Sequence, residues 1–182
     1  SRNHSKMRDE AIVIDPNGTK GEVIDIGGIH ICLPRKPKKS EILFSDKGKD
    51  LQMWQRIPMP EELRRVRSMD EWGEMPREFR ERFRPYIEEE FRRRRDGVWF
   101  YNNGNPTYIT GRHYMALQWT KFDIGYPNYL SFQRDIFLHM AACEADPNCI
   151  GQLYTKCRRS GYTNICAAVL VDEASQVKDK LL

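Results

Sequence analysis

The sequence has no apolar run that approaches the length of a membrane span, and its polar, basic start lacks the apolar core of a signal peptide. Its five cysteines are scattered, odd in number and without a C-x-x-C pair. This usage argues against a zinc site and for a reducing compartment. No acidic cluster can be assigned to a nuclease centre. We therefore expect neither a membrane span nor a structural zinc.

The sequence also lacks a large excess of charge of either sign. The 30 Lys and Arg residues are nearly balanced by 26 Asp and Glu, which leaves a formal net charge of +4. Two basic stretches stand out, at residues 34–39 and 92–95. The second ends a predicted helix, where the helix dipole favours cations, so it has a structural explanation. Contact with nucleic-acid phosphates and packing against a partner protein stay open as alternatives.

The first part of the chain is predicted to combine short strands with charged helices. Strand-like runs at 11–14, 22–26 and 29–33, with turn signals at 15–18 and 27–28, indicate a small two- or three-stranded meander. Beyond the basic stretch at residues 34–39, which we interpret as a linker, the sequence favours helices that begin at prolines.

These helices are predicted over residues 60–67 and 76–95. The second one carries an apolar stripe, because four apolar residues recur every four positions. The stripe consists of Phe79, Phe83, Ile87 and Phe91. Pro85 is expected to kink this helix or to split it.

A phosphate-binding loop is indicated at residues 156–163, which spell Lys-Cys-Arg-Arg-Ser-Gly-Tyr-Thr. The ordinary loop, G-x-x-x-x-G-K-[ST], cradles phosphates with backbone N–H groups, while its lysine reaches the β/γ-phosphates and its hydroxyl binds Mg²⁺. Gly161 and Thr163 keep these positions, and Tyr162 stands where the lysine is expected. Lys156 takes the place of the first glycine, from which its side chain can still fold over the loop. The alternative is a basic turn without function.

The segments on either side suit a nucleotide site. Residues 150–155 favour a strand. Residues 163–170 predict a helix with one apolar face, formed by Ile165, Cys166, Val169 and Leu170. In a strand–turn–helix arrangement, the helix N-terminus points its N–H groups and its positive dipole end at a phosphate.

A second motif lies upstream, where aromatic residues precede Gln133. A glutamine amide offers a donor and an acceptor side by side, which matches the N6 and N7 edge of adenine. Phe132 or Tyr129 would pack against the base. The segment also predicts an amphipathic helix, with one side formed by Phe132, Ile136, Met140 and Cys143. A core helix with a solvent-facing Gln133 is therefore the alternative.

Residues 97–114 predict an aromatic hairpin followed by a helix. The strand-favouring aromatics are Trp99, Tyr101 and Tyr108. Asn103-Gly104 is a turn signal at the centre of the hairpin, and Thr110 is expected to cap the helix. We interpret His113 as a hydrogen-bonded structural histidine, in preference to a catalytic or metal-binding one.

These motifs resemble those of the large terminase subunit of tailed bacteriophages, the ATPase that pumps DNA into the capsid. The loop with the displaced lysine is similar to the deviant Walker A motif of that family, and residues 129–136 are similar to its adenine-reading motif. Residues 97–114 look like the stretch before its ATPase core. The likeness covers about residues 97–175 and is most specific at the loop.

The resemblance implies an α/β fold, in which residues 97–182 begin the parallel sheet of a P-loop NTPase and residues 1–96 form an α+β accessory arm. It implies that ATP, bound with Mg²⁺, is hydrolysed to move double-stranded DNA into a procapsid. The implied partners are viral DNA, the portal protein, the small terminase subunit and further copies of the chain in a ring. The implied location is the host cytoplasm at the portal vertex, away from any membrane.

The resemblance also assigns roles to single residues. Lys156 neutralises phosphate charge, and Arg158 or equally Arg159 stabilises the transition state or senses the γ-phosphate. Thr163 binds Mg²⁺. Gln133 reads adenine. The implied nucleotide-binding set is Phe132, Gln133, Lys156, Ser160, Gly161, Tyr162 and Thr163.

Residues 169–173 spell an apparent Walker B motif, an apolar run that ends in Asp172 and Glu173. A crossover from the loop's helix to another parallel strand needs about ten residues or more, and the motif begins too soon after Thr163. We therefore expect both carboxylates on the outer face of that helix. The true Walker B and a nuclease domain are then expected outside the chain, which would be an N-terminal fragment without activity of its own.

Two further classes of protein stay open. A helicase-like or other P-loop ATPase would share the glutamine and the phosphate loop. A non-enzymatic nucleic-acid-binding protein would depend on the two basic stretches, and the loop would then be a coincidence.

Overall fold

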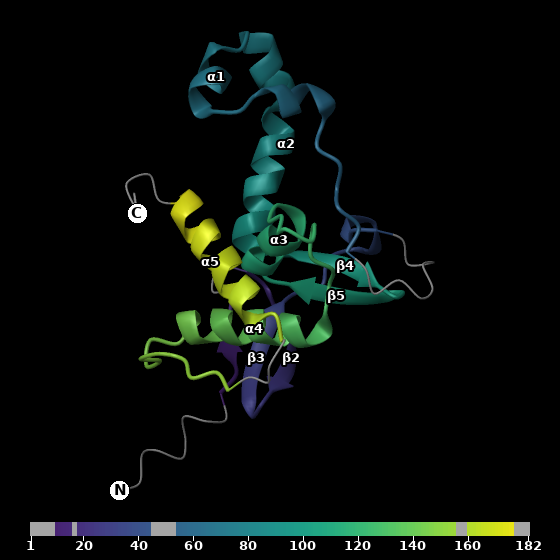
Figure 1. Ribbon diagram of the computed structural model, residues 1–182. Helices are drawn as coiled ribbons and strands as arrows, with labels where there is room; N and C mark the ends of the chain where they lie inside the picture. The colour runs from purple at the N-terminus through teal and green to yellow at the C-terminus, as the bar shows by residue number, and fades with distance from the viewer. Residues whose placement is uncertain (1–9, 16–17, 45–53, 156–159, 177–182) are drawn as a thin grey trace, which may run out of the picture.

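The computed structural model describes residues 10–15, 18–44, 54–155 and 160–176 of the 182-residue chain. Helices and strands are mixed in it (Figure 1). The strands are β1 Ile12–Val13, β2 Lys20–Ile26, β3 Ile29–Pro34, β4 Val98–Asn102 and β5 Asn105–Ile109. The helices are η1 Lys39–Glu41, η2 Glu61–Arg65, α1 Met69–Glu74, α2 Arg77–Asp96, α3 Gly111–Gln118, α4 Ser131–Ala145 and α5 Tyr162–Gln176. The α/β class is thus confirmed at this coarse level.

The first sheet has three strands in the order β1-β3-β2. Strands β2 and β3 form an antiparallel hairpin whose turn contains Gly27 and Gly28, with φ of +61° and +84°. Glycine adopts these left-handed angles without steric cost, so the predicted turn is confirmed. Of the predicted two- or three-stranded meander, the two-stranded form is confirmed by β2 and β3, and the three-stranded form is wrong, because β1 pairs in parallel with the far edge of β3 instead of with β2.

The second sheet is the predicted hairpin. Strands β4 and β5 are antiparallel, with Asn102 opposite Asn105 at the end of the ladder. Asn103 and Gly104 form the two-residue turn, and both have positive φ, at +49° and +78°. This is the backbone for which an Asn-Gly pair is preferred, because asparagine and glycine tolerate left-handed angles best. The segment that follows η1 joins this sheet through Leu43, whose N–H and C=O form hydrogen bonds with β4.

The predicted strand at residues 150–155 is not formed. Ile150 and Leu153 are 105% and 95% exposed, so this segment buries neither of its large apolar side chains. A strand is stabilised by a neighbour that takes up its backbone hydrogen bonds, and the described residues place no such neighbour beside it. Within the described chain, the short β1 and β3 are the only strands that pair in parallel.

The long helix α2 projects from the body of the molecule and carries α1 at its far end (Figure 1). Its predicted bounds are confirmed, and Pro85 lies within the helix without splitting it. The expected stripe is only partly buried, since Phe83 is buried but Phe91 is 61% exposed. The helix expected over 60–67 is the shorter 3-10 helix η2.

Three clusters of buried apolar side chains hold the elements together. One joins the first sheet, the β4–β5 hairpin and α4, and its central members are Ile31, Leu33, Ile42, Trp99, Tyr108, Leu138 and Ala142. A second surrounds Trp54, Phe100 and Tyr114, and a third joins α3, α4 and α5 through Phe137 and Ile165. Residues from both sides of position 96 share the first cluster. The division into an arm and an ATPase region stays a prediction.

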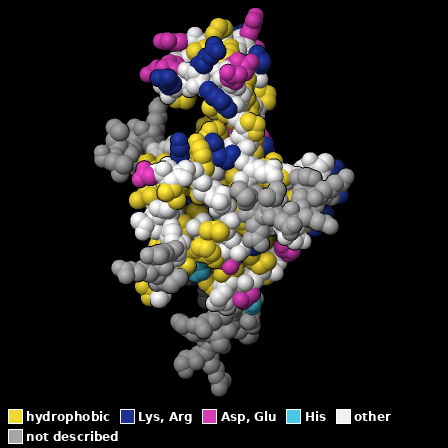
Figure 2. All heavy atoms as spheres, turned by 45° about the vertical axis from the view of Figure 1, so that its right-hand side comes forward, with side chains coloured by type: hydrophobic (Ala, Val, Ile, Leu, Met, Phe, Trp, Pro, Cys, Tyr) yellow, Lys and Arg dark blue, Asp and Glu magenta, His cyan; other side chains and the backbone are white. Residues whose placement is uncertain are grey.

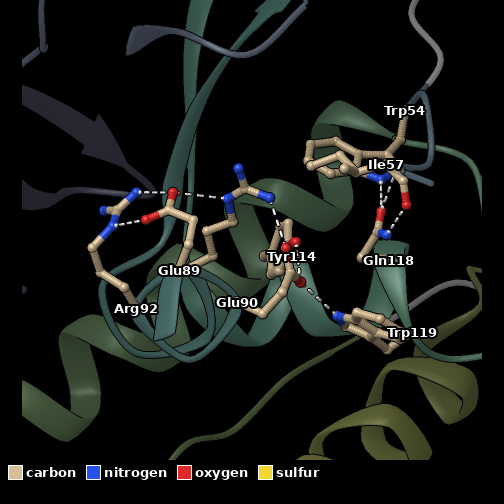
Figure 3. Close-up of polar contacts among 9 residues, drawn as sticks. Trp54, Ile57, Glu89, Glu90, Arg92, Tyr114, Gln118 and Trp119 are labelled. Carbon is tan, nitrogen blue, oxygen red and sulfur yellow. Dashed lines mark hydrogen bonds and ion pairs between the residues drawn. The ribbon is translucent and has the colours of Figure 1, made fainter. Parts of the chain in front are cut away.

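Two buried polar networks fix α3 against its neighbours (Figure 3). The Glu90 carboxylate of α2 accepts hydrogen bonds from the Tyr114 hydroxyl at 2.6 Å and from Trp119 Nε1 at 3.1 Å. Gln118 Oε1 accepts from Trp54 Nε1 at 3.2 Å and from the Ile57 N–H at 3.0 Å. Because a buried polar group must be paired, each network specifies one arrangement of the helices it joins.

A membrane-crossing helix is not found: none of the described helices combines the necessary length with sufficient apolar character.

Candidate functional site

The predicted helix after the glycine loop is α5, which begins one residue after Gly161. Gly161 has φ of +72°, and its carbonyl accepts the N–H groups of Asn164 at 3.0 Å and Ile165 at 3.1 Å. Helix geometry leaves the N–H groups of the first turn, at Tyr162 and Thr163, without an acceptor inside the helix. These donors and the positive dipole end make the start of α5 suited to an anionic ligand.

Gln133 lies beside this loop, although the sequence separates the two motifs. It stands in the first turn of α4, and a methyl group added at Gly161 would lie 3.1 Å from Gln133 Nε2. A contact shorter than 3.4 Å is tight, so glycine is the residue that lets the amide approach the loop this closely. The structure therefore brings the proposed adenine-reading side chain and the proposed phosphate loop together.

A cavity of about 270 Å³ opens next to Gln133. Its walls come from α3, the connecting segment 122–130, α4 and the first turns of α5. Its lining includes polar side chains that can form hydrogen bonds, namely His113, Asn128, Gln133 and Asn164. An apolar cavity with a few convergent polar groups is the usual form of a small-molecule site.

His113 is the most buried polar side chain of this wall, at 1% exposure. Its ring is stacked between Phe137 at 4.5 Å and Tyr129 at 5.7 Å between centroids. Burial, with a smaller contribution from the charge of Arg134, lowers the pKa of His113 to about 3. Neither ring nitrogen has a hydrogen-bond partner among the described residues. The prediction of a hydrogen-bonded histidine is therefore wrong, because its neighbours offer aromatic faces instead of acceptors.

The two aromatic residues predicted to pack against the base, one in α4 and one just before it, differ in their exposure. Phe132 is 45% exposed and is not among the residues that line the cavity. Tyr129 is buried and packs edge-on against Phe100 at 5.2 Å. Of the two aromatic residues expected to cover the base, only Phe132 thus has an accessible side chain.

The described part of the loop carries three further predicted residues. The Ser160 hydroxyl is buried and has no partner among the described residues. The ring of Tyr162 stacks on Tyr154 at 4.6 Å, and Thr163 is exposed at the second position of α5. Lys156, Arg158 and Arg159 lie outside the described residues, and their roles stay predictions.

The apparent Walker B motif lies within α5, so its interpretation as helix is confirmed. Its placement on an outer face is wrong for Asp172, which is 1% exposed. Asp172 accepts a hydrogen bond from Arg94 of α2, and Glu173 accepts one from Arg112 of α3 at 2.9 Å. The sequence pattern missed this role because ion pairs between distant segments leave no local periodicity.

The arginines at 92–95 are all engaged within the chain. Arg92 and Arg93 bond to Glu89, Arg94 to Asp172, and Arg95 to its neighbour Asp96. Charges of both signs are also intermixed around α1 and the adjoining end of α2 (Figure 2). Side-chain ion pairs therefore largely match the charges of these arginines, a structural role different from the predicted interaction with the helix dipole, which stays a prediction.

No match emerges when the chain is compared with protein-family models, with curated proteins and with solved structures. The function must therefore be argued from the site itself. In the described residues, no group of three or more His, Cys, Asp or Glu side chains is arranged to hold a metal ion.

Proposed function

We propose that the chain is the nucleotide-binding part of a DNA-packaging motor, the large terminase subunit of a tailed phage. In this proposal ATP lies at the start of α5, with its phosphates on the Gly161 loop and its base near Gln133. The observation that carries the proposal is the contact distance of 3.1 Å between Gln133 Nε2 and the methyl position of Gly161. Packing of α4 against α5 through Phe137 and Ile165 places the two motifs side by side, which supports a shared role in nucleotide binding.

The start of α5 supplies what a phosphate group needs. The free N–H groups of Tyr162 and Thr163 and the helix dipole attract the negative charge, and the Ser160 hydroxyl offers one more donor. Lys156 would add a full positive charge from the residues that precede the described loop. When bound through Thr163, Mg²⁺ would neutralise charge on the phosphate oxygens.

The packaging motor is preferred to a helicase because of the displaced lysine. A lysine at the position of the first glycine is the feature by which the loop resembles the large terminases, and the ordinary loop places it after the second glycine. The non-enzymatic alternative is less well supported, since the arginines of one of the two basic stretches on which it depends, residues 92–95, are paired with Glu89, Asp96 and Asp172.

The experiment that tests the function is DNA-stimulated ATP hydrolysis by the full-length polypeptide that contains this chain. Three proteins are compared: wild type, Lys156→Ala and, as a control, Lys20→Ala at an exposed position of β2, outside both basic stretches. We expect Lys156→Ala to lower the rate by about 10²–10³-fold, as loss of one preorganised electrostatic group does, and Lys20→Ala to leave it unchanged.

Each other outcome points to a different function. Full activity in Lys156→Ala would contradict the role given to this lysine. Wild-type hydrolysis with duplex unwinding and without DNA cleavage would favour the helicase-like ATPase. DNA binding without any ATP hydrolysis would support the alternative of a non-enzymatic nucleic-acid-binding protein.

A further inference from the structure

We propose that His113 is a second base-reading residue of this site and that its ring donates a hydrogen bond to N1 of adenine. The inference rests on the proposed function, because it assigns a further specificity residue to the same ligand. Gln133 would occupy the N6 and N7 edge of the base, which leaves N1 as the acceptor next to it.

The unpaired nitrogens of His113 carry the argument. Both are buried, and neither has a partner among the described residues. A buried polar group without a partner destabilises the folded protein. A phenylalanine in the same aromatic stack would pack as well without this cost. A histidine at this position is therefore explained by a partner that arrives from outside the chain.

The surroundings of the ring restrict that partner to one direction. Phe137 and Tyr129 both stack on the imidazole, with interplanar angles of 14° and 21°. Only the ring edge, which carries the nitrogens, is left for a polar contact. His113 and Gln133 both belong to the wall of the same cavity. The ring nitrogens are buried in the free protein, so the proposed hydrogen bond requires side chains of the cavity wall to move when the base enters.

The size and protonation of the site suit a neutral base. The cavity of about 270 Å³ is smaller than the about 300–1,000 Å³ typical of pockets that enclose a drug-sized ligand. It thus suits one ring system, with the ribose and phosphates outside it near Gly161. Because burial keeps the imidazole neutral, it presents one N–H donor and one acceptor nitrogen to the ligand.

The test uses ATP and 1-deaza-ATP, an analogue that lacks the N1 acceptor, as ligands for the full-length polypeptide. Calorimetric titration measures both affinities for wild type, His113→Phe and the control His139→Phe, which changes a histidine of α4 outside the cavity lining. Denaturant unfolding of the same proteins is recorded without ligand.

We expect His113→Phe to weaken ATP binding about tenfold or more while it raises the denaturation midpoint, since an unpaired polar group has been removed. Wild type should bind 1-deaza-ATP about as weakly as His113→Phe binds ATP, and the variant should not distinguish the two ligands. His139→Phe should bind ATP like wild type.

The failures of this inference and of the proposed function are distinguishable. If wild type binds ATP and 1-deaza-ATP equally, His113 does not read N1, whatever the variant does, while the ATP site itself stands. If wild type binds neither ligand, both proposals are wrong.

Discussion

Arg94 Nη2 of α2 lies 2.9 Å from Asp172 Oδ1 of α5, and the Asp172 side chain is 1% exposed. Arg94 also donates a hydrogen bond to Ser175 one turn further along α5. The long helix that carries α1 is thereby tied to the helix that follows the proposed phosphate loop. A shift of α5 on ligand binding would act directly on α2 through this pair.

Removal of Asp172 should destabilise the protein strongly, because it leaves the guanidinium of Arg94 without its buried partner. We expect Asp172→Ala to lower the free energy of unfolding by about 3–5 kcal/mol. The control is Glu81→Ala, which breaks an exposed pair with Arg77 whose side chains are 51% and 85% exposed. An exposed pair contributes about 0–1 kcal/mol. Equal losses in urea denaturation would show that the Arg94–Asp172 pair is not a structural link.

Gly161→Ala should weaken ATP binding severalfold. The new methyl group would press against Gln133 Nε2, and φ of +72° is unfavourable for alanine. Gly27→Ala is a matched control, since Gly27 has φ of +61° but open space around it in the β2–β3 turn. Both variants should lose about 1 kcal/mol of stability from the backbone. Equal ATP affinity in the two variants would show that Gly161 is not part of the ATP-binding site.

Local patterns of the sequence predicted local structure well. The Asn103-Gly104 turn, the Thr110 cap and the helix after Gly161 are all confirmed, since each depends on residues close together in the chain. Turn and capping preferences act on a few neighbouring residues and need no tertiary partner.

Long-range relationships were not predictable in the same way. The pairing of β1 with β3 depends on which sheet edge is free, and the apolar residues at 150–155 stay exposed because no strand lies beside them. Of the proposed site, the sequence supplied Gln133 and the loop but not their contact. Neither Glu90 nor Asp172 was expected to be buried, because the partners that compensate their charges come from other elements.

Tyr114→Phe should reveal the network around Glu90. Burial, followed by the hydrogen bond to the Glu90 carboxylate, raises the pKa of the Tyr114 hydroxyl. A hydrogen bond to a charged group contributes about 1.5–3 kcal/mol, so the variant should lose about this much at neutral pH. Above pH 10 the unfolded tyrosine ionises while the folded one stays neutral, and wild-type stability falls with rising pH. The stability of the Tyr114→Phe variant should fall less steeply with rising pH. Parallel stability curves from pH 9 to 11 would contradict this.

His113 should give the protein a pH dependence on the acidic side. Its folded pKa of about 3 is below its ordinary value of 6.5, so between these pH values the unfolded chain binds a proton that the folded chain does not bind. This contribution to stability is complete above pH 6.5 and is lost as the pH falls towards 3, at up to about 1.4 kcal/mol per pH unit. The difference in unfolding free energy between His113→Phe and wild type should grow over this range. A constant difference would show that His113 is protonated in the folded protein.

The central claim is that the base of ATP enters the cavity between α4 and the start of α5. Photolabelling with 8-azido-ATP in the presence of Mg²⁺, followed by peptide mapping, tests where the base lies. We predict that the label falls on peptides from the cavity lining, within residues 122–133 or 164–168, and that excess ATP prevents it. Labelling confined to α1 and α2, or labelling that ATP does not prevent, would contradict the account.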